Sequence, residues 1–280
     1  MTATFTLRGG MEVDDPRLGR IPSFDSRSRQ YGVRKLLTAR EEQTLKGRTW
    51  MLVPVYDQGI PLSRVVVEQI QRDLGLAIEP WDPSACTGFS AGYDLIAQPK
   101  PAKPADITPA MCFKIYRLAQ TMDEWSGEDY EGSSVLGTCK AMAKLGYIGE
   151  YHWAFGIDEM LMALSHLGPV VVGTDWQGSM FDPKPNGLLN VSRDSRDTAG
   201  GHAYIVQSII MSKWRKRFLL GMHEDIRSEP LLRIHNSWGK SWGRNGDAFM
   251  WASDMDELLR GVKYPGEARV TTSHFYKLAA

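Results

Sequence analysis

The sequence predicts an α+β protein in which a mainly helical lobe packs against an antiparallel sheet or barrel-like β lobe. Two observations carry this prediction. Apolar residues recur at helical spacing through the middle of the 280-residue chain, and short apolar or alternating segments follow. Helices that precede strands favour two layers, with the default site in the cleft between them. We therefore expect an extended N-terminal arm (residues 1–50), a mainly helical lobe (51–160) and a mainly β lobe (161–280).

The composition is that of a globular protein and excludes several functional classes. Lys and Arg number 33, as do Asp and Glu, so the zero net charge argues against a generally basic protein that binds nucleic acid. The longest apolar run, 168–173, is far shorter than the roughly 20 residues of a membrane-spanning helix. Residues 1–10 lack the apolar core of a signal peptide. Because three cysteines cannot all pair, we expect free thiols and a reducing, cytoplasmic location.

The expected helices present apolar residues every three or four positions, and several begin or end at residues typical of helix caps. Thr108 and Pro109 suit the cap and first position of one helix, and Gly146 suits the end of the next. The expected segments are 62–74, 86–97, 109–122, 133–146 and 158–167.

The expected strands lie in the second half of the chain. Leu232, Ile234 and Asn236 alternate with Arg233 and His235, which is the two-residue period of a half-buried strand. The basic run 213–217 is expected to be a solvated hairpin tip between two strands, with nucleic-acid contact as the alternative. The expected segments are 170–174, 203–210, 218–222, 231–235 and 248–251.

Cys86 is the candidate nucleophile. Small and capping residues precede it, and a helix-compatible stretch follows as far as Ala97. A cysteine at a helix N-terminus meets unpaired backbone N–H groups and the positive end of the helix dipole, and both stabilise a thiolate. The alternative is that Cys86 is a small buried residue of the core.

His202 and Asn236 are the candidate base and its orienting partner. His202 follows two glycines at the start of an apolar strand, where a rigid backbone presents the imidazole and a second chain has room to approach. Asn236 ends another strand, so its amide is placed to orient a ring nitrogen of His202. Trp238 would cover that hydrogen bond from water. The neighbouring His235 points to the opposite face of its strand, so it is not chosen as the base.

Gln58 completes a set of residues suited to acyl transfer. It lies in a turn, and its neutral amide is a suitable donor to a developing oxyanion. A thiol nucleophile, an imidazole base, an amide that orients the base and an oxyanion donor are what this reaction requires. In chain order the candidates are Gln58, Cys86, His202 and Asn236.

These segments resemble the papain-like cysteine peptidases. Residues 236–246 match the family signature Asn-Ser-Trp-Gly-x-x-Trp-Gly-x-x-Gly throughout, and Gly-Gly-His-Ala at 200–203 follows a second family pattern. The resemblance covers residues 50–260. It implies a two-lobe papain-like fold, thiol-dependent hydrolysis of a protein or peptide substrate, and no cofactor. Three segments are similar to the shorter, unsecreted members of bacterial and bacteriophage type: 24–29, 168–176 and 182–187.

The chain departs from the family pattern in two places near the nucleophile. Thr87 stands where the family has Trp, and Gln58 and Cys86 are 28 positions apart, a much longer interval than the family's. The expected helix at 62–74 lies in this insertion and is a candidate lid or partner surface. If both ends of the insertion return to one place, Gln58 still reaches the oxyanion.

The resemblance also assigns residues to the substrate cleft. The family's Gly-Gly pair that binds substrate backbone falls at 131–132, so only Gly132 matches, and Glu131 would bias the cleft toward basic side chains. Gly201 and Trp238 are the other expected substrate contacts. No recognisable inhibitory propeptide precedes the catalytic part.

Two other functions compete with a peptidase. Ser90, in a Gly-x-Ser-x-Gly pattern at 88–92, would be the nucleophile of an α/β-hydrolase, but the prolines before it argue against the strand that this motif needs. A papain-like scaffold without activity is the more serious alternative, for example a virion component with an assembly partner and a virion-associated location. A metal site is not expected, because no Cys-x₂-Cys pair and no His-Glu-x-x-His pattern is present.

Overall fold

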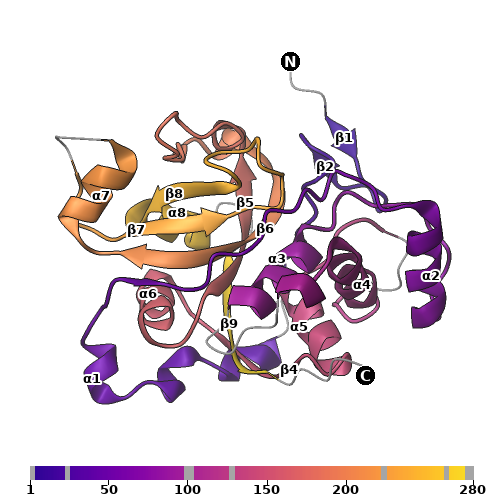
Figure 1. Cartoon of the computed structure of the whole chain (residues 1–280), viewed down its shortest axis with the longest axis horizontal. Helices are drawn as coiled ribbons and strands as arrows, with labels where there is room; N and C mark the ends of the chain where they lie inside the picture. Colours follow the sequence, from indigo (N-terminus) through magenta and orange to yellow (C-terminus); the bar gives the residue numbers. More distant parts are fainter. Residues whose placement is uncertain are drawn as a thin grey trace.

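Helices α2 to α5 gather on one side of the molecule, and most of a large antiparallel sheet lies on the other side with the remaining helices (Figure 1). The computed structural model describes residues 4–22, 26–97, 104–125, 130–221, 226–261 and 265–274. Within these ranges, no helix is long and apolar enough to cross a membrane. The arrangement confirms the α+β class.

The helices are mostly short and amphipathic. The α-helices are α1 (Ala39–Glu42), α2 (Arg64–Leu74), α3 (Cys86–Ala97), α4 (Pro109–Gln120), α5 (Val135–Lys144), α6 (Ile157–His166), α7 (Lys213–Leu220) and α8 (Ala252–Arg260). Five 3₁₀ turns occur in the described ranges: η1 (Ser26–Gln30), η2 (Val33–Leu36), η3 (Pro104–Asp106), η4 (Gly178–Met180) and η5 (Ser195–Asp197).

Seven of the strands form one antiparallel sheet. Its path is β4-β9-β5-β6-β7-β8, and β3 pairs with β6 beside this path. The strands β1 and β2 form a separate hairpin near the N-terminus. The bounds are β1 (Phe5–Thr6), β2 (Glu12–Val13), β3 (Arg48–Thr49), β4 (Ile148–Trp153), β5 (Val170–Gln177), β6 (Thr198–Ile210), β7 (Leu231–His235), β8 (Asp247–Trp251) and β9 (Glu267–His274).

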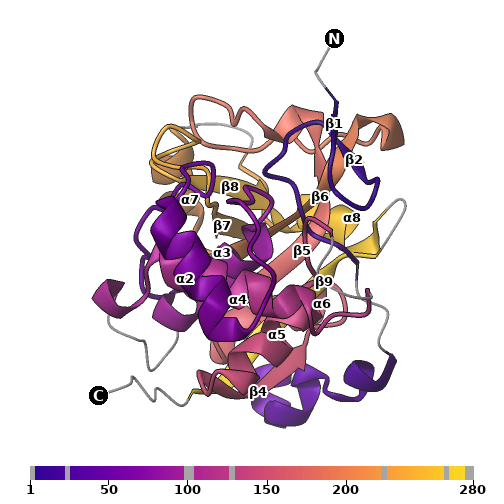
Figure 2. The same cartoon turned by 90° about the vertical axis from the view of Figure 1, so that its right-hand side faces the viewer.

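The two faces of the sheet belong to different cores. Val171, Ala203 and Ile205 join the core formed with α3, α4 and α5. Val170 and Val206 join a second core that includes residues of α6 and α8. Because side chains alternate along a strand, β5 and β6 contribute to both cores at once. Figure 2 shows α2, α4 and α5 in front of the sheet, and β6 therefore lies where the two lobes meet.

The central helix α3 is buried along its whole length. Two glycines one turn apart, Gly88 and Gly92, let α4 approach it closely. A Cβ at Gly88 would overlap the carbonyl oxygen of Cys112, and a Cβ at Gly92 would overlap the sulfur of that cysteine. This packing fixes the start of α3 against β6, with which the helix is also in contact.

The N-terminal arm passes between the lobes before it reaches the sheet. After the hairpin of β1 and β2, Asp14 N–H donates to the carbonyl of Ala199 (2.9 Å). The chain then runs across the start of β6, forms η1, η2 and α1, and joins the sheet through β3. The hairpin and α1 lie at opposite ends of the view in Figure 1, so the arm spans the molecule.

All five expected helices are present as α2 to α6, and four of the five expected strands are present as β5 to β8. The expected strand at 218–222 is wrong, as is the hairpin tip at 213–217. Residues 213–220 form α7, because Ser212 caps its first turn and Gly221 ends it with a left-handed backbone. The strands β4 and β9 were not expected. Residues 24 and 25 of the segment 24–29, and residue 222, lie outside the described ranges.

Candidate active site

Cys86 is the first residue of α3 and is buried between the lobes. The loop before it is held by Asp82, whose carboxylate accepts from the backbone N–H (2.8 Å) and the hydroxyl (2.6 Å) of Ser84. The backbone N–H groups of Ala203, Gly19 and Thr87 contact the Cys86 thiol. The thiol therefore lies at a helix N-terminus and beside the strand that carries His202.

His202 and Asn236 form the hydrogen bond that the sequence predicts. Nε2 of His202 lies 2.8 Å from Oδ1 of Asn236, and both side chains are fully buried. That amide oxygen also accepts from the Ser237 N–H (2.7 Å), so the asparagine is itself fixed. The other ring nitrogen of His202, Nδ1, is buried with no hydrogen-bond partner in the described ranges. It is the nitrogen available for proton exchange with a neighbouring thiol.

Aromatic rings enclose this pair. The ring of Trp238 lies 4.7 Å from that of His202, and the ring of Trp176 lies 4.9 Å from it on β5. Trp242 packs against both tryptophans. This cluster keeps water from the histidine–asparagine hydrogen bond, the role expected for Trp238.

Gln58 returns to the site despite the insertion. Its backbone N–H donates to the Ser237 carbonyl (2.8 Å), and its side-chain oxygen accepts from the Ser237 hydroxyl. Its amide nitrogen donates to the carbonyl of Pro83 (2.6 Å), three residues before Cys86. The two ends of the insertion that contains helix α2 therefore lie close together. Gln58 links the loop before Cys86 to the turn after Asn236.

The N-terminal arm lies across these residues as an extended peptide. Its Arg20 N–H donates to the carbonyl of Gly201 (3.0 Å), and its Ile21 N–H donates to the carbonyl of Ser133 (2.9 Å). The Ser133 N–H in turn donates to the carbonyl of Gly19 (2.9 Å), so Arg20 forms a parallel bridge with Ser133. The arm pairs with both walls of the cleft through its backbone.

Glycines make this close approach feasible. A Cβ at Gly132 would overlap the carbonyl oxygen of Gly19, and a Cβ at Gly201 would overlap that of Arg20. On the arm itself, a Cβ at Gly19 would overlap the carbonyl oxygen of Ser84. The two glycines expected to contact substrate backbone, Gly132 and Gly201, therefore contact a peptide backbone here, and that peptide belongs to the same chain.

A third arm residue contacts the remaining site residues. The carbonyl of Arg17 accepts from the Gln58 amide (2.9 Å), and the Arg17 guanidinium lies 4.5 Å above the ring of Trp238. Residues 17–21 of the N-terminal arm thus cover the site, although the sequence of this arm has no recognisable propeptide pattern. The contacts that hold this segment are mostly backbone hydrogen bonds, which leave little trace in its sequence.

Burial sets the ionisation of the site. It raises the pKa of the Cys86 thiol to about 11, although the three backbone N–H groups beside the sulfur act in the opposite direction. It lowers the pKa of His202 to about 4, against the opposing effect of the hydrogen bond with Asn236. In this closed arrangement the pair is therefore a neutral thiol and a neutral imidazole at pH 7.

Other candidates lie outside the site. Ser90 sits inside α3 rather than at a strand-to-helix turn, and its hydroxyl donates to the Thr87 carbonyl (2.9 Å). The Glu131 carboxylate accepts from the Arg8 backbone N–H of the N-terminal arm (2.8 Å). His235 bonds to Asp247 (2.7 Å). No group of three His, Cys, Asp or Glu side chains suited to a metal occurs in the described ranges.

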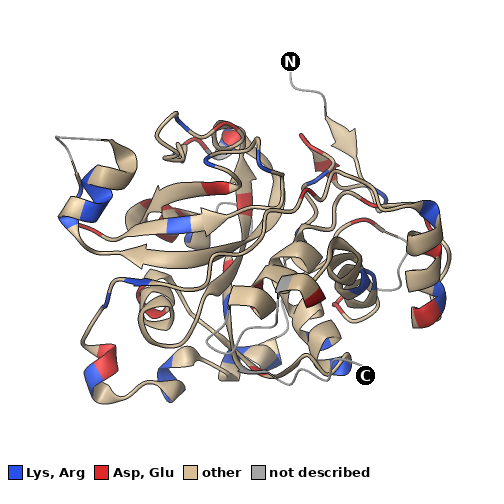
Figure 3. Cartoon of the chain, viewed as in Figure 1, with Lys and Arg blue, Asp and Glu red and all other residues tan. Residues whose placement is uncertain are grey.

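The basic run 213–217 has a structural use in α7. Lys216 is buried, and its ammonium donates to the carbonyls of Arg227 and Glu229 (2.8 Å each). Figure 3 shows further Lys and Arg residues on the same helix. At least one cation of the run therefore fixes a loop and is not available to nucleic acid.

The fold is similar to that of papain-like cysteine proteases. The solved structure of a digestive procathepsin L2 proteinase from Tenebrio molitor larval midgut matches with a TM-score of 0.53 and 14% identity, over 92% of this chain and 79% of that one. Xylellain, a cysteine protease from Xylella fastidiosa, matches with a TM-score of 0.46 and 17% identity, over 92% and 96% of the two chains. No protein-family model and no curated protein matches the sequence. The papain-like two-lobe fold expected from the sequence is thus confirmed.

Proposed function

We propose that this chain is a thiol peptidase that the structure holds in a closed form. The observation that carries the proposal is the site itself. A cysteine opens the buried helix α3, and its thiol contacts the backbone N–H of Ala203, the residue after His202. An asparagine orients that histidine, and a peptide lies across the site. Cys86 is the nucleophile, His202 the base and acid, Asn236 the orienting residue and Gln58 the oxyanion donor.

The reaction runs through a thioester. The Cys86 proton passes to Nδ1 of His202, and the sulfur bonds to the carbonyl carbon of the substrate. The carbonyl oxygen becomes an oxyanion, which accepts hydrogen bonds from the Cys86 N–H and the Gln58 amide. His202 then gives its proton to the leaving amine as the C–N bond breaks. Water, deprotonated by His202, attacks the thioester, the C–S bond breaks, and a carboxylic acid and the thiol result.

The arm runs against the direction of a productive substrate. His202 must reach the leaving amine, so the C-terminal part of a substrate lies beside Trp238, which packs on the histidine. In the arm, the Arg17 guanidinium lies over the ring of Trp238, and the chain continues from there over Cys86 toward Ser133. The arm therefore enters with its N-terminal end where the leaving group belongs. It occupies the cleft without offering a bond for cleavage.

The proposal is tested by displacing the arm without touching the triad. Gly19→Ala places a methyl group on the Ser84 carbonyl and opens the cleft, whereas Gly47→Ala, in the same arm, meets only ordinary contacts of 3.6 Å or more. After brief exposure to limiting iodoacetamide, mass spectrometry compares the alkylation of Cys86 with that of Cys112 and Cys139. We expect Gly19→Ala to speed alkylation of Cys86 about 10-fold or more, since overpacking of this kind costs about 1–3 kcal/mol.

Two further outcomes decide between a peptidase and an inactive scaffold. In the Gly19→Ala background, His202→Ala should remove the faster alkylation of Cys86 relative to the other two cysteines, because the histidine generates the thiolate. The same background should hydrolyse an unfolded protein substrate, and Cys86→Ser should abolish this. If Cys86 becomes accessible but reacts no faster than a free thiol, and no substrate is cut, the chain is an inactive papain-like scaffold and the proposal of a peptidase fails.

A further inference from the structure

Helix α7 presents two exposed aromatic rings on its outer face. Trp214 is 70% exposed and Phe218 is 74% exposed, whereas the next most exposed aromatic residues of the described ranges, Trp125 and Phe155, reach 49%. The rings of Trp214 and Phe218 stack one turn apart, with centroids 5.6 Å apart and planes inclined by 11°. Single apolar side chains are ordinary on a surface, but a stacked pair forms a continuous patch of the kind found at interaction sites.

The opposite face of α7 is fixed to the body of the molecule. Leu220 is buried in a small core with Leu231, Phe249 and Trp251. Lys216, one turn before Leu220, is buried with its ammonium on the carbonyls of residues 227–229. Because these contacts hold the helix in one orientation, it cannot turn to bury the aromatic pair. The pair therefore stays in water unless a partner covers it.

Cations flank the aromatic pair on both sides. Lys213, Arg215 and Arg217 are exposed, and none of them forms an ion pair with a residue in the part of the chain that the structure describes. With 3.6 residues per turn, Lys213 and Arg217 lie on one side of the rings and Arg215 lies on the other. The sequence of α7 contains no acidic residue, so its outer face carries three positive charges around two rings.

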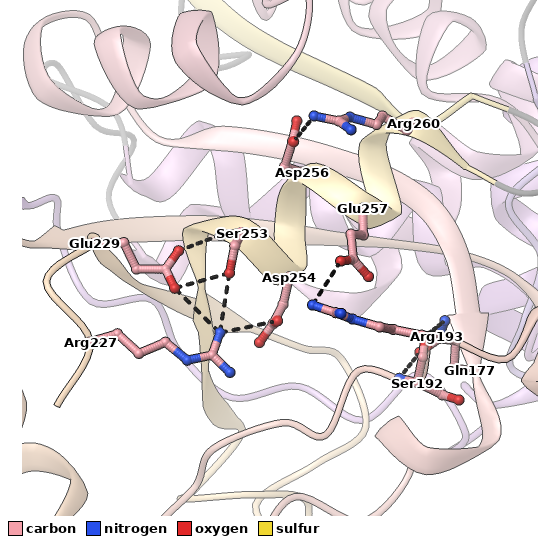
Figure 4. A network of polar contacts seen from close by, with 10 residues as sticks. All are labelled: Gln177, Ser192, Arg193, Arg227, Glu229, Ser253, Asp254, Asp256, Glu257 and Arg260. Atoms are coloured by element: carbon pink, nitrogen blue, oxygen red, sulfur yellow. Dashed lines mark hydrogen bonds and ion pairs between the residues drawn. The ribbon is translucent and has the colours of Figure 1, made fainter. Parts of the chain in front are cut away.

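Acidic residues near the fixed face of α7 have other partners (Figure 4). Glu229 pairs with Arg227 (3.3 Å) and accepts from the N–H and the hydroxyl of Ser253 (2.6 and 2.9 Å). Asp254 pairs with the same arginine (3.4 Å). These contacts fasten the loop that holds Lys216 to α8. Their negative charge is shared with Arg227, so it does little to offset the cations on the outer face of α7.

Helix α7 lies at the end of the sheet away from the candidate active site. It connects the end of β6 to the start of β7, whereas His202 is near the start of β6 and Asn236 follows β7. From His202 to Ile210 the strand extends about 26 Å. In Figure 1, α7 projects from the edge of the molecule, so it can meet a broad flat surface without covering the cleft.

We infer that α7 docks on a membrane surface that contains anionic phospholipids. Trp214 and Phe218 enter the boundary between headgroups and acyl chains, the region of a bilayer in which aromatic side chains are enriched. Lys213, Arg215 and Arg217 stay level with the lipid phosphates, because their long side chains keep the charge in the polar layer while the rings are buried. Rings and cations act together, since stable attachment to a membrane takes two signals.

An aromatic and basic surface is also the composition of a single-stranded nucleic-acid site, but the geometry of α7 favours a membrane. Such a nucleic acid is held in a groove that follows its backbone, and successive bases stack on separate aromatic side chains. On α7 the two rings stack on each other, which occupies one face of each ring. The helix also projects from the surface, as Figure 1 shows.

Co-sedimentation of the full chain with vesicles tests this inference. Vesicles of phosphatidylcholine are compared with vesicles of phosphatidylcholine and phosphatidylserine in equal amounts. We expect about 100-fold tighter binding to the mixed vesicles, or about 5-fold for each of the three cations. Changing these cations together (Lys213→Gln, Arg215→Gln and Arg217→Gln) should remove this preference. Trp214→Ala with Phe218→Ala should weaken binding to the mixed vesicles about 10-fold or more.

Matched variants elsewhere separate α7 from the general charge and hydrophobicity of the surface. Arg40→Gln, Arg64→Gln and Arg72→Gln together remove the same charge from exposed positions of α1 and α2. Trp125→Ala with Phe155→Ala removes two other exposed rings. Both variants should bind the mixed vesicles as the parent chain does. Thermal unfolding of each variant confirms that it is folded, since every substituted side chain is exposed.

Three results would overturn the inference: a parent chain that does not sediment with mixed vesicles, α7 variants that bind as the parent does, or matched variants that lose as much binding as the α7 variants. Binding of a fluorescent oligothymidine through the same α7 residues, with no binding of vesicles, would assign the surface to nucleic acid instead. The proposed peptidase is tested separately, because α7 contributes no residue to the candidate active site.

Discussion

Tyr116 links two parts of the cleft that are far apart in the sequence. Its hydroxyl donates to the buried carboxylate of Asp82 and accepts from the backbone N–H of Gly132 (2.8 Å). Asp82 organises the loop before Cys86, and Gly132 lies against the arm. Burial raises the pKa of Asp82, and the tyrosine hydrogen bond opposes that effect. One phenol therefore supports both the loop before Cys86 and the backbone of Gly132, which lies against the arm.

Tyr116→Phe should lower the free energy of unfolding by about 2–4 kcal/mol, because it strands a buried carboxylate oxygen and a buried N–H group at once. Urea denaturation of the full chain measures this. Tyr31→Phe is the matched control, since Tyr31 is exposed and the same change there should stay within about 0.5 kcal/mol. A loss at Tyr116 as small as that of the control would show that water replaces the phenol without cost.

At the scale of elements, the contact between α3 and α4 depends on space that Gly92 leaves for the sulfur of Cys112. Gly92→Ala should cost about 1–3 kcal/mol of stability, because the new methyl group and the sulfur overlap. Cys112→Ala in the same chain should restore most of this loss. Its remaining Cβ would lie at an ordinary 3.7 Å from the new methyl group.

Gly88→Ala provides the matched comparison for this rescue. The methyl group at position 88 meets the backbone oxygen of Cys112 rather than its side chain, so Cys112→Ala should not repair it. Thermal unfolding of the single and double variants distinguishes the two cases. Equal rescue at both glycines would mean that α4 shifts as a whole, and that the thiol has no particular role in the packing.

The elements that were predicted correctly are those with local signals. Thr108 and Ser134 cap α4 and α5 through their side chains, as their positions before apolar runs indicate. The end of helix α7 resembles a strand in sequence, because residues 218–220 are three consecutive apolar residues without helical spacing. The cap at Ser212 is the local signal for a helix. The strands β4 and β9 pair mainly with each other across more than a hundred residues, and short-range patterns carry no information about such pairing.

The same distinction separates the site residues. Cys86, His202 and Asn236 lie in motifs that are continuous in the sequence, so the sequence alone marks them as candidates. Glu267 enters the cleft, where it forms an ion pair with the N-terminal arm, only because β9 pairs with β5, and Gly19 only because the arm folds back over α3. A glycine in a polar arm and a glutamate near the end of the chain have no local pattern that marks them as part of the cleft.

At the scale of the whole molecule, closure of the arm and ionisation of the site are coupled. The arm brings Asp15 and Arg17 near His202, and Asn236 meets the histidine from the turn after β7. Burial keeps Cys86 a thiol and His202 a neutral imidazole. Any state in which the arm has left lets water reach both groups and returns their pKa values toward the ordinary range. Closure of the arm is therefore most favourable in the pH range where Cys86 and His202 are neutral in the open form too, because closing then removes no charge from water.

Acid should release the arm. His202 has a pKa of about 4 in the closed form against an ordinary 6.5, so the contribution of its neutral form to closure is complete above pH 6.5 and is lost as the pH falls toward 4. The full difference corresponds to about 3 kcal/mol. The pKa of Asp15 is lowered in the closed form, so its protonation acts in the same direction. Above pH 9 the Cys86 thiol, with a pKa of about 11 in the closed form, should weaken closure again.

Hydrogen exchange at the arm amides measures this directly. The N–H groups of Arg20 and Ile21 are protected by Gly201 and Ser133 only while the arm is closed. After correction for intrinsic exchange, their protection should fall roughly 50- to 100-fold between pH 7.5 and 4.5. His202→Gln should flatten this acid limb, because the glutamine does not titrate. Two results would contradict the coupling: protection of the arm amides that stays constant over this range, or a loss of protection in acid that persists in His202→Gln. Either would mean that the arm opens without exposing the histidine to water.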